Sequence, residues 1–184
     1  GSRPSAVPGF TVDQKQVLDS TGALELTEIP KSMLCIGGGY IGLELGTFYA
    51  KIGTQVTIVE ALPNLLGTID PDLSQVVVKG LKKRGVEVRV DTRVARWKKG
   101  KGRLLDVELV GQSQGQSQGQ NQQKNGNVLC VEKILVTVGR TPNTDRLGLE
   151  KAGLPDSKGF IAVNNRCQTR VPHIYAIGDV AGQP

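Results

Sequence analysis

A cluster of glycines near residue 40 has the spacing of a phosphate-binding loop. The sequence reads Gly37-Gly38-Gly39-Tyr40-Ile41-Gly42, which satisfies the pattern GxGxxG. In such a loop Gly37 would permit the tight turn, Gly39 would let the backbone approach a pyrophosphate, and Gly42 would allow close helix–strand packing. The helix that follows presents unpaired N–H groups and its positive dipole end to the phosphates. The pattern therefore predicts a dinucleotide site.

An acidic residue, Glu60, lies 18 residues beyond Gly42, at the end of the next predicted strand. A carboxylate at that place accepts hydrogen bonds from both hydroxyls of an adenosine ribose and repels a 2′-phosphate. No Arg or Lys follows in Ala61-Leu62-Pro63-Asn64, so NAD is favoured over NADP. The alternative is that Glu60 is an ordinary solvated glutamate at a strand end.

The elements around the loop strengthen the prediction, because 24 of the 184 residues are glycine and chance matches to the pattern are easy. Residues 33–36 form a short apolar run, which is typical of a buried parallel strand. Apolar residues then recur at helical spacing over residues 40–52, and Gly53 follows as the expected helix end. Residues 56–59 predict a second strand, which completes a β-α-β unit.

A second helix is predicted downstream, capped by Asp70 or Asp72, with Pro71 in its first turn and its end near Arg84. The apolar stripe of this helix consists of Leu73, Val76, Val77 and Leu81. Strands follow at residues 86–90, 94–97, 104–110, 128–131 and 134–138. The predicted fold class is α/β, with a Rossmann-like parallel sheet, its helices and a three-stranded antiparallel meander.

Proline, glycine and polar runs predict how the chain divides. Residues 1–30 contain several turn-forming residues and are interpreted as a connector, and residues 31–145 as the dinucleotide-binding domain. Residues 146–184 lead out of that domain. Within it, residues 111–127 repeat a GQSQ unit and hold no apolar side chain, so they are predicted to form a mobile hairpin tip.

Composition excludes several classes of partner. The net charge of +6 comes from short basic runs without interleaved aromatic residues, so we expect no nucleic-acid partner. No run approaches 18 apolar residues, so we expect no membrane span, and no signal-peptide pattern opens the sequence. Cys35, Cys130 and Cys167 have no metal-ligand spacing and no metal site is expected. Their odd number favours a reducing compartment, the cytoplasm or, in a eukaryote, the mitochondrial matrix.

Four ordered motifs resemble those of one enzyme family. They are Ser20-Thr21-Gly22-Ala23-Leu24, the segment from Ile36 to Gly46, Val138-Gly139-Arg140-Thr141-Pro142-Asn143, and Ile174-Tyr175-Ala176-Ile177-Gly178-Asp179. In this order they resemble the pyridine nucleotide-disulfide oxidoreductases, and most of all the dihydrolipoamide dehydrogenase branch. The resemblance covers nearly the whole chain except the Gln/Gly-rich segment. Mercuric reductases and glutathione reductases share the layout, and Glu60 argues against the NADP-using glutathione branch.

The resemblance implies an architecture. Family members carry an FAD domain, a nested NAD domain, a return to the FAD domain and a dimerisation domain. Strands at both ends of this chain would then flank the NAD domain as parts of the FAD domain. Gly1 and Ser2 resemble the end of the first FAD segment, although they could be a cloning remnant, and Asp179 resembles the aspartate that binds the flavin ribityl chain.

The resemblance also implies roles for residues around the nucleotide. Residues 37–44 would line the pyrophosphate and the nicotinamide, with Ile41 in their middle. Tyr40 matches a residue that gates the nicotinamide pocket in some members, or it is a half-buried aromatic at the helix start. Glu44 matches a glutamate near the nicotinamide, and Val94 matches an adenine-side contact. Gly139 matches a backbone contact at the nicotinamide end.

The implied function is that of a larger enzyme, which oxidises dihydrolipoamide through a redox disulfide, FAD and NAD. Its partners would be the lipoyl domains of a 2-oxo-acid dehydrogenase complex and a second copy of itself. The CxxxxC disulfide, the first FAD fingerprint and the histidine–glutamate base are missing from this sequence, and the single histidine, His173, is not expected to be catalytic. We therefore expect the chain to bind NAD(H) and to catalyse nothing alone. A mercuric-reductase-like enzyme and a free-standing dinucleotide-binding module are the alternatives.

Overall fold

The computed structural model describes residues 1–111, 127–154 and 159–182, so the predicted hairpin tip lies almost wholly outside the described residues. The chain forms two compact units, which are described separately. The larger unit is Ala6–Val138, and the smaller unit combines Gly1–Ser5 with Gly139–Pro184.

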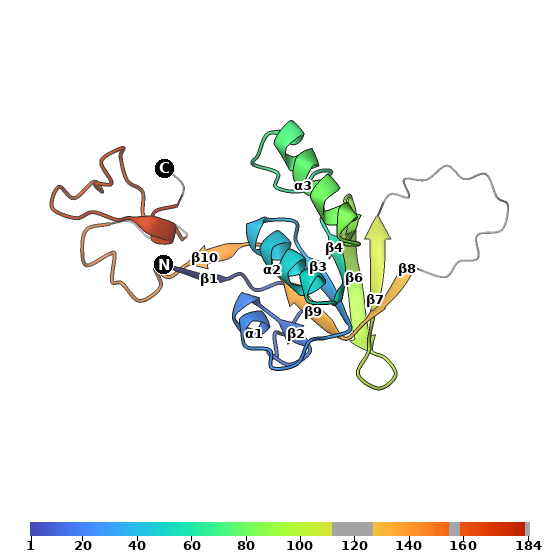
Figure 1. Ribbon diagram of the computed structural model, residues 1–184. Helices are drawn as coiled ribbons and strands as arrows, with labels where there is room; N and C mark the ends of the chain where they lie inside the picture. The colour runs from blue at the N-terminus through green and yellow to red at the C-terminus, as the bar shows by residue number, and fades with distance from the viewer. Residues whose placement is uncertain (112–126, 155–158, 183–184) are drawn as a thin grey trace. The chain divides into compact units, whose positions relative to one another are not determined.

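A five-stranded parallel sheet forms the centre of the larger unit (Figure 1). In spatial order its strands are β2 (Val17–Leu18), β9 (Lys133–Val136), β3 (Ser32–Ile36), β4 (Gln55–Val59) and β5 (Glu87–Arg89). Strand β3 pairs with both β4 and β9, and these pairings are parallel. The predicted parallel sheet is therefore confirmed.

Helices connect the strands of this sheet. They are α1 (Ser20–Leu24), α2 (Tyr40–Lys51) and α3 (Pro71–Lys83). Asp70 caps α3 as predicted, because its carboxylate accepts a hydrogen bond of 2.9 Å from the amide of Asp72 while Pro71 occupies the first turn. Helix α2 ends as predicted before Gly53, whose φ of 102° is a left-handed conformation that favours glycine.

An antiparallel meander follows β5. It consists of β6 (Thr92–Lys99), β7 (Leu105–Gly111) and β8 (Asn127–Val131), with β7 in the middle. The register of β6 on β7 shifts between Val94 and Arg96, which marks a β-bulge. The predicted three-stranded meander is confirmed.

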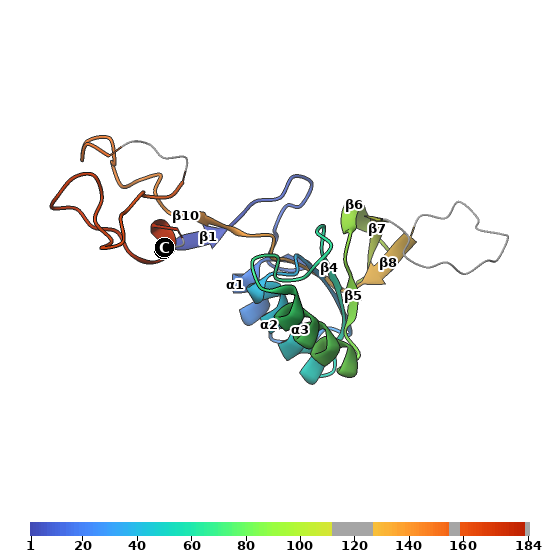
Figure 2. The ribbon, with the colours of Figure 1, turned by 90° about the horizontal axis from the view of Figure 1, so that it is seen from above.

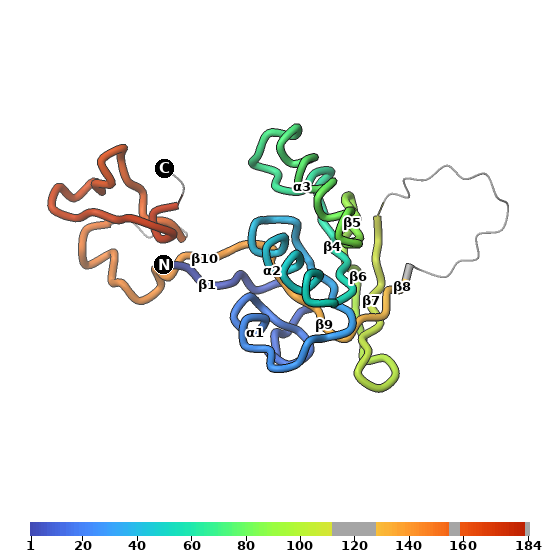
Figure 3. The backbone as a smooth tube through the Cα atoms, viewed as in Figure 1, coloured from blue at the N-terminus to red at the C-terminus, as the bar shows by residue number. Residues whose placement is uncertain are grey.

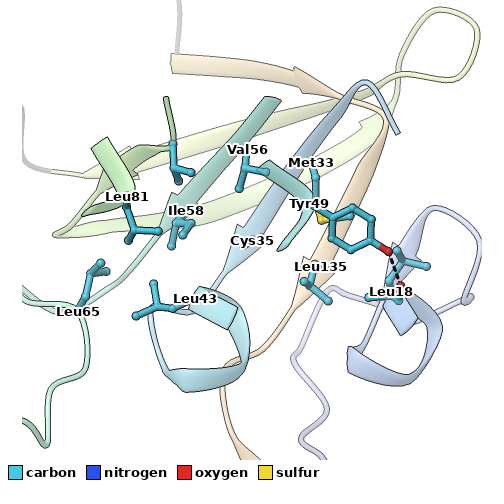
Figure 4. Close-up of a cluster of buried hydrophobic side chains, with 12 residues drawn as sticks. Leu18, Met33, Cys35, Leu43, Tyr49, Val56, Ile58, Leu65, Leu81 and Leu135 are labelled. Atoms are coloured by element: carbon cyan, nitrogen blue, oxygen red, sulfur yellow. Dashed lines mark hydrogen bonds between the residues drawn. The ribbon is translucent and has the colours of Figure 1, made fainter. Parts of the chain in front are cut away.

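The sheet is covered on both faces, by the helices on one side and the meander on the other (Figure 2). Alternate residues of β3 take part in the two cores: Met33 and Cys35 pack with the helices, and Leu34 and Ile36 pack with the meander. Figure 4 shows the helix-side core, in which Leu43 of α2 and Leu81 of α3 point towards the strands. Burial on both faces explains why β3 is an uninterrupted apolar run.

The prediction that the apolar stripe of α3 faces the core is mostly wrong, because most of its residues face solvent. Leu73 and Val76 are 62% and 66% exposed, and Val77 is also exposed, whereas Leu81 is buried. The line that faces the core is instead Ser74 and Leu81, which are buried, and Val78, which is partly buried. Both lines have helical spacing, so periodicity alone does not choose between them. Ser74 is accommodated because its hydroxyl donates to the carbonyl of Pro71 at 3.1 Å.

Two short elements, β2 and α1, lie within the segment expected to be a connector. Val17 and Leu18 are fully buried and pair with β9 at the edge of the sheet. Figure 3 shows the backbone of α1, which follows β2, beside that of β9. Asp19 caps α1 by accepting hydrogen bonds from the amides of Thr21 and Gly22. A strand of two residues gives no period that sequence inspection can detect, which is why β2 was not predicted.

The smaller unit contains a two-stranded antiparallel sheet, formed by β1 (Ser2–Pro4) and β10 (Arg140–Pro142), and the short 3-10 helix η1 (Gly178–Val180). Leu154, Ile161 and Ala176 form its buried cluster. Within the fourth motif, Tyr175 makes an isolated antiparallel bridge with Gln168. In the described parts of the chain, none of the helices has the length and apolarity needed to cross a bilayer.

Candidate functional site

The glycine loop lies at the carboxyl ends of β3 and β4. The amide of Gly37, directly after β3, donates to the carbonyl of Val59 in β4 at 2.9 Å. Glu60 follows Val59 immediately, so the two predicted features of the site meet at one edge of the sheet. Open α/β sheets bind their ligands at this edge.

Two of the loop glycines are required by close approach. Gly37 has a φ of 107°, and a Cβ there would lie 2.7 Å from the carbonyl oxygen of Thr137. A Cβ on Gly42 would lie 2.2 Å from the carbonyl oxygen of Gly37 and 2.6 Å from Oγ1 of Thr137. The start of α2 therefore packs directly on the turn and on the end of the sheet.

Gly39 differs from both, because a Cβ there would meet nothing within 4 Å. It is the N-cap of α2 and has an extended conformation, with φ −81° and ψ −179°. The first hydrogen bond of the helix runs from the amide of Leu43 to the carbonyl of Gly39, at 3.1 Å. The amides of Tyr40, Ile41 and Gly42 precede it and have no partner within the helix. Open space next to these amides suits the close approach of an anionic group.

The carboxylate of Glu60 is fixed by two backbone amides. Oε2 accepts a hydrogen bond of 2.7 Å from Gly38, and Oε1 accepts one of 2.9 Å from Leu62. Each carboxylate oxygen has further lone pairs, so the group can still accept hydrogen bonds from ribose hydroxyls. The half-buried Glu60 is thus held against the loop rather than free in solvent.

Contacts that the sequence did not predict also shape the loop. The carbonyl of Gly38 accepts a hydrogen bond of 2.9 Å from the amide of Leu66, and Leu65 packs beside Gly38. The hydroxyl of Thr137 lies 3.1 Å from the carbonyl of Ile36 and 3.3 Å from that of Gly37. The apolar residues Leu65 and Leu66, in a loop that is mostly exposed, are the sequence signal that could have drawn attention to this segment.

The other candidate residues of the larger unit lie around the loop or on the meander. Tyr40 is 53% exposed at the start of α2, and Glu44 is exposed one turn later. Ile41 is half-buried. Val94 is half-buried in β6, where it packs against the meander-side core. The roles of these residues as ligand contacts stay predictions.

Four candidates belong to the smaller unit, namely Gly1, Ser2, Gly139 and Asp179. The carboxylate of Asp179 accepts a hydrogen bond from the hydroxyl of Ser2, and Nε of Arg140 lies 3.8 Å from Oδ2 of Asp179. Arg140 also donates to the carbonyl of Ser2 at 2.7 Å. These contacts join β1 and β10 to η1.

Comparison with known proteins decides the family. The family described as pyridine nucleotide-disulphide oxidoreductase matches residues 1–184. The chain belongs to this family. It is a portion of a flavoprotein disulfide oxidoreductase, and the resemblance inferred from the four motifs is confirmed.

Curated relatives in this family include dihydrolipoyl dehydrogenases. Over the whole chain, the identity is 43% to the protein from Geobacillus stearothermophilus and 44% to that from Thermus scotoductus. The chain spans 37% and 38% of the length of these relatives, respectively.

Solved structures of the family share the fold. The HOCl-induced flavoprotein disulfide reductase RclA from Escherichia coli, as its Cu(II) complex, matches with a TM-score of 0.79 and 30% identity, over 100% of this chain and 38% of RclA. LpdA from Mycobacterium tuberculosis matches with a TM-score of 0.80 and 27% identity, over 99% of this chain and 37% of LpdA.

A cavity of about 620 Å³ lies elsewhere on the larger unit. Residues 15–16, 26–31, 102–103 and 132–133 line it. Since Lys31 precedes β3 and Lys133 begins β9, the cavity is at the amino ends of the strands, at the opposite edge from the glycine loop. Among the described residues, no three His, Cys, Asp or Glu side chains are grouped so as to hold a metal ion.

Proposed function

We propose that the chain is the NAD(H)-binding part of a dihydrolipoyl (dihydrolipoamide) dehydrogenase, flanked by segments of the FAD domain. The observation that carries the proposal is the pairing of Glu60 with Gly38 beside the open space at Gly39. The carboxylate can accept the ribose hydroxyls, while Gly39 and the first turn of α2 can receive the pyrophosphate. The identity of 43% and 44% to dihydrolipoyl dehydrogenases supports this enzyme over a mercuric reductase.

The proposed NAD-binding domain, residues 31–145, largely coincides with the compact unit Ala6–Val138, to which β2 and α1 also belong. Residues 1–30 and 146–184 would connect to the FAD domain of the whole enzyme. Asp179 is the residue proposed to contact FAD, with Gly1 and Ser2 nearby in the same unit. The glycine fingerprint of an FAD domain is not among these residues, so flavin contacts here would be limited to an edge.

In the whole enzyme, NAD accepts the electrons that the dithiol substrate delivers through FAD. The residues of this chain would contribute binding and orientation: Glu60 would fix the adenosine end, and the first turn of α2 would fix the phosphates. The lipoyl domains of a 2-oxo-acid dehydrogenase complex and a second subunit are the proposed partners. The chain by itself would bind NAD(H) without turnover.

A calorimetric titration of the chain with NADH and then NADPH tests the proposal. We expect NADH to bind, with NADPH at least about tenfold weaker, because Glu60 repels the 2′-phosphate. Equal affinities would contradict the role of Glu60. In a second assay, NADH oxidation that depends on lipoamide should be undetectable, and measurable turnover would contradict the expected inactivity.

A further inference from the structure

The loop between β4 and α3 contacts the glycine loop directly. We refer to residues 61–69 of this segment as the brace. Within the brace Leu62 and Gly67 are exposed, but Leu65 is only 1% exposed and belongs to the helix-side core. Figure 4 shows Leu65 on this loop, among the side chains of Leu43, Ile58 and Leu81. The brace is therefore anchored in the core.

Leu65 occupies the space beside Gly38. A Cβ on Gly38 would lie 2.4 Å from Cδ2 of Leu65 and 3.2 Å from Cβ of Glu60. A side chain at this position would therefore require Leu65 and Glu60 to shift, although the backbone of Gly38 is not left-handed. The middle glycine of the triplet has a packing reason that the GxGxxG pattern does not require.

The backbone of Leu66 is hydrogen-bonded to the carbonyl group of Gly38. Its amide donates to the carbonyl of Gly38 at 2.9 Å, and its own φ is 53°. A left-handed conformation is unfavourable for leucine, because its Cβ approaches the following carbonyl. Such a conformation persists only where the surrounding structure enforces it, and it is concentrated at functional sites. Here it directs the amide of Leu66 to the glycine loop.

We infer that Leu65 and Leu66 are positioning residues of the nucleotide site, an inference that rests on the proposed binding of NAD(H). The carboxylate of Glu60 accepts from the amide of Gly38, and the amide of Leu66 donates to the carbonyl of Gly38, so both backbone polar groups of this residue are already hydrogen-bonded within the protein. The phosphates then meet the backbone from Gly39 onward. The brace sets the place of Gly39 by holding the residue before it.

Two substitutions of Leu66 separate backbone positioning from packing. Leu66→Val keeps an apolar side chain, but its β-branch resists the left-handed conformation. Leu66→Asn loses the apolar side chain, but asparagine tolerates that conformation. Leu24→Val is the matched control, because Leu24 is 74% exposed at the end of α1.

NADH titration of the four chains gives the first result. We expect Leu66→Val to weaken NADH binding about tenfold and Leu66→Asn about twofold, because the left-handed conformation costs a bulky residue most. Leu24→Val should bind like the unsubstituted chain. The reverse order, or equal losses for the two Leu66 variants, would show that Leu66 contributes packing alone and would overturn the inference.

Amide hydrogen exchange by NMR gives a result that does not depend on NADH. The quantity measured is the ratio of the exchange rate of the Gly38 amide to that of the Leu34 amide in the centre of the sheet. This ratio should rise in Leu66→Val and should change less in Leu66→Asn. If the unsubstituted chain does not bind NADH, the proposed function fails while this ratio still tests the brace. An unchanged ratio in Leu66→Val would overturn the inference even if NADH binds.

Discussion

The carboxylate of Glu60 accepts a hydrogen bond of 2.7 Å from the amide of Gly38. The bond joins the end of β4 to the turn after β3, so the proposed ribose acceptor and the proposed phosphate loop are fixed relative to each other. A site organised in this way loses little side-chain freedom when a ligand binds. The contact also accounts for the half-buried position of Glu60 directly after β4.

Glu60→Gln should change the preference between the two nicotinamide cofactors. Glutamine retains an acceptor for one amide but removes the charge, so NADH binding should weaken by about tenfold, the difference typical of charge-assisted hydrogen bonds. NADPH should gain relative to NADH because the 2′-phosphate is no longer repelled. Fluorescence titrations with both cofactors measure the ratio of the NADH and NADPH affinities. Glu25→Gln is the control, because it removes the same charge at an exposed position. An unchanged ratio would speak against the ribose role.

Gly39→Ala should affect NADH binding, whereas Gly42→Ala should affect stability. At Gly39 the added Cβ has open space around it, so the free energy of unfolding should change by less than about 1 kcal/mol while NADH binding weakens. At Gly42 the added Cβ overlaps the carbonyl of Gly37, so the free energy of unfolding should fall by about 1–3 kcal/mol. Urea unfolding and NADH titration separate the two. Full NADH affinity in Gly39→Ala would contradict close phosphate approach.

Truncations on α3 should reveal its buried line. Leu81→Ala should lower the free energy of unfolding by about 2–5 kcal/mol, because Leu81 is 3% exposed in the core. Leu73→Ala should change it by less than about 0.5 kcal/mol, because Leu73 is 62% exposed. Chemical unfolding curves of both variants make the comparison. Similar losses would indicate that Leu73 is also covered.

Asp13 should make stability depend on acidic pH. Burial alone would raise the pKa of Asp13, but hydrogen bonds from the amides of Lys15, Val17 and Gln16 outweigh it, and the pKa lies below its ordinary value of 3.8. The folded state therefore binds the proton more weakly than the unfolded state does. The stabilisation is present above pH 3.8 and is lost as the pH falls through the lowered pKa.

Unfolding of Asp13→Asn compared with the unsubstituted chain between pH 2 and 6 measures this contribution. The difference in stability should be largest at the upper end of the range and should shrink in acid. A difference that stays constant with pH would show that the carboxylate charge has no part in the turn before β2.

The cysteines should differ in reactivity towards an alkylating reagent. Burial raises the pKa of the Cys35 thiol to about 12, so Cys35 should stay unmodified in the folded chain. The Cys130 thiol donates to Asp106 at 3.3 Å, which raises the pKa of Cys130, and Asp106→Asn should speed its reaction. Mass spectrometry of iodoacetamide-treated protein measures each site. Rapid native modification of Cys35 would contradict its burial.

The sequence predicts those parts of the fold that local chemistry determines. The run at β3 is apolar because both of its faces are buried, and Asp70 with Pro71 marks the start of α3 whatever the helix packs against. The proximity of the glycine loop and Glu60 could be predicted from the sequence, because the carboxyl ends of parallel strands lie at the same edge of a sheet. These features need no knowledge of distant contacts.

Other features depend on contacts between distant segments. The rotation of α3 is set by its packing on the sheet, which buries Ser74 in preference to the more apolar Leu73. The left-handed conformation of Leu66 has no sequence signal, since glycine or asparagine is the residue that usually marks it. The bond from Leu66 to Gly38 could therefore be seen only in three dimensions.

The position of β9 has a consequence for synthesis on the ribosome. In the finished sheet β9 separates β2 from β3, and Leu34 of β3 pairs with Ile134. A nascent chain that ends at residue 111 holds β2, β3, β4 and β5 but lacks the strand that joins β2 to the others. Closing a sheet across so long a separation is slow because the chain entropy must be lost first. The unit therefore gains one of the inner strands of its sheet last, and a translation product interrupted before β9 would leave β2 without its neighbour.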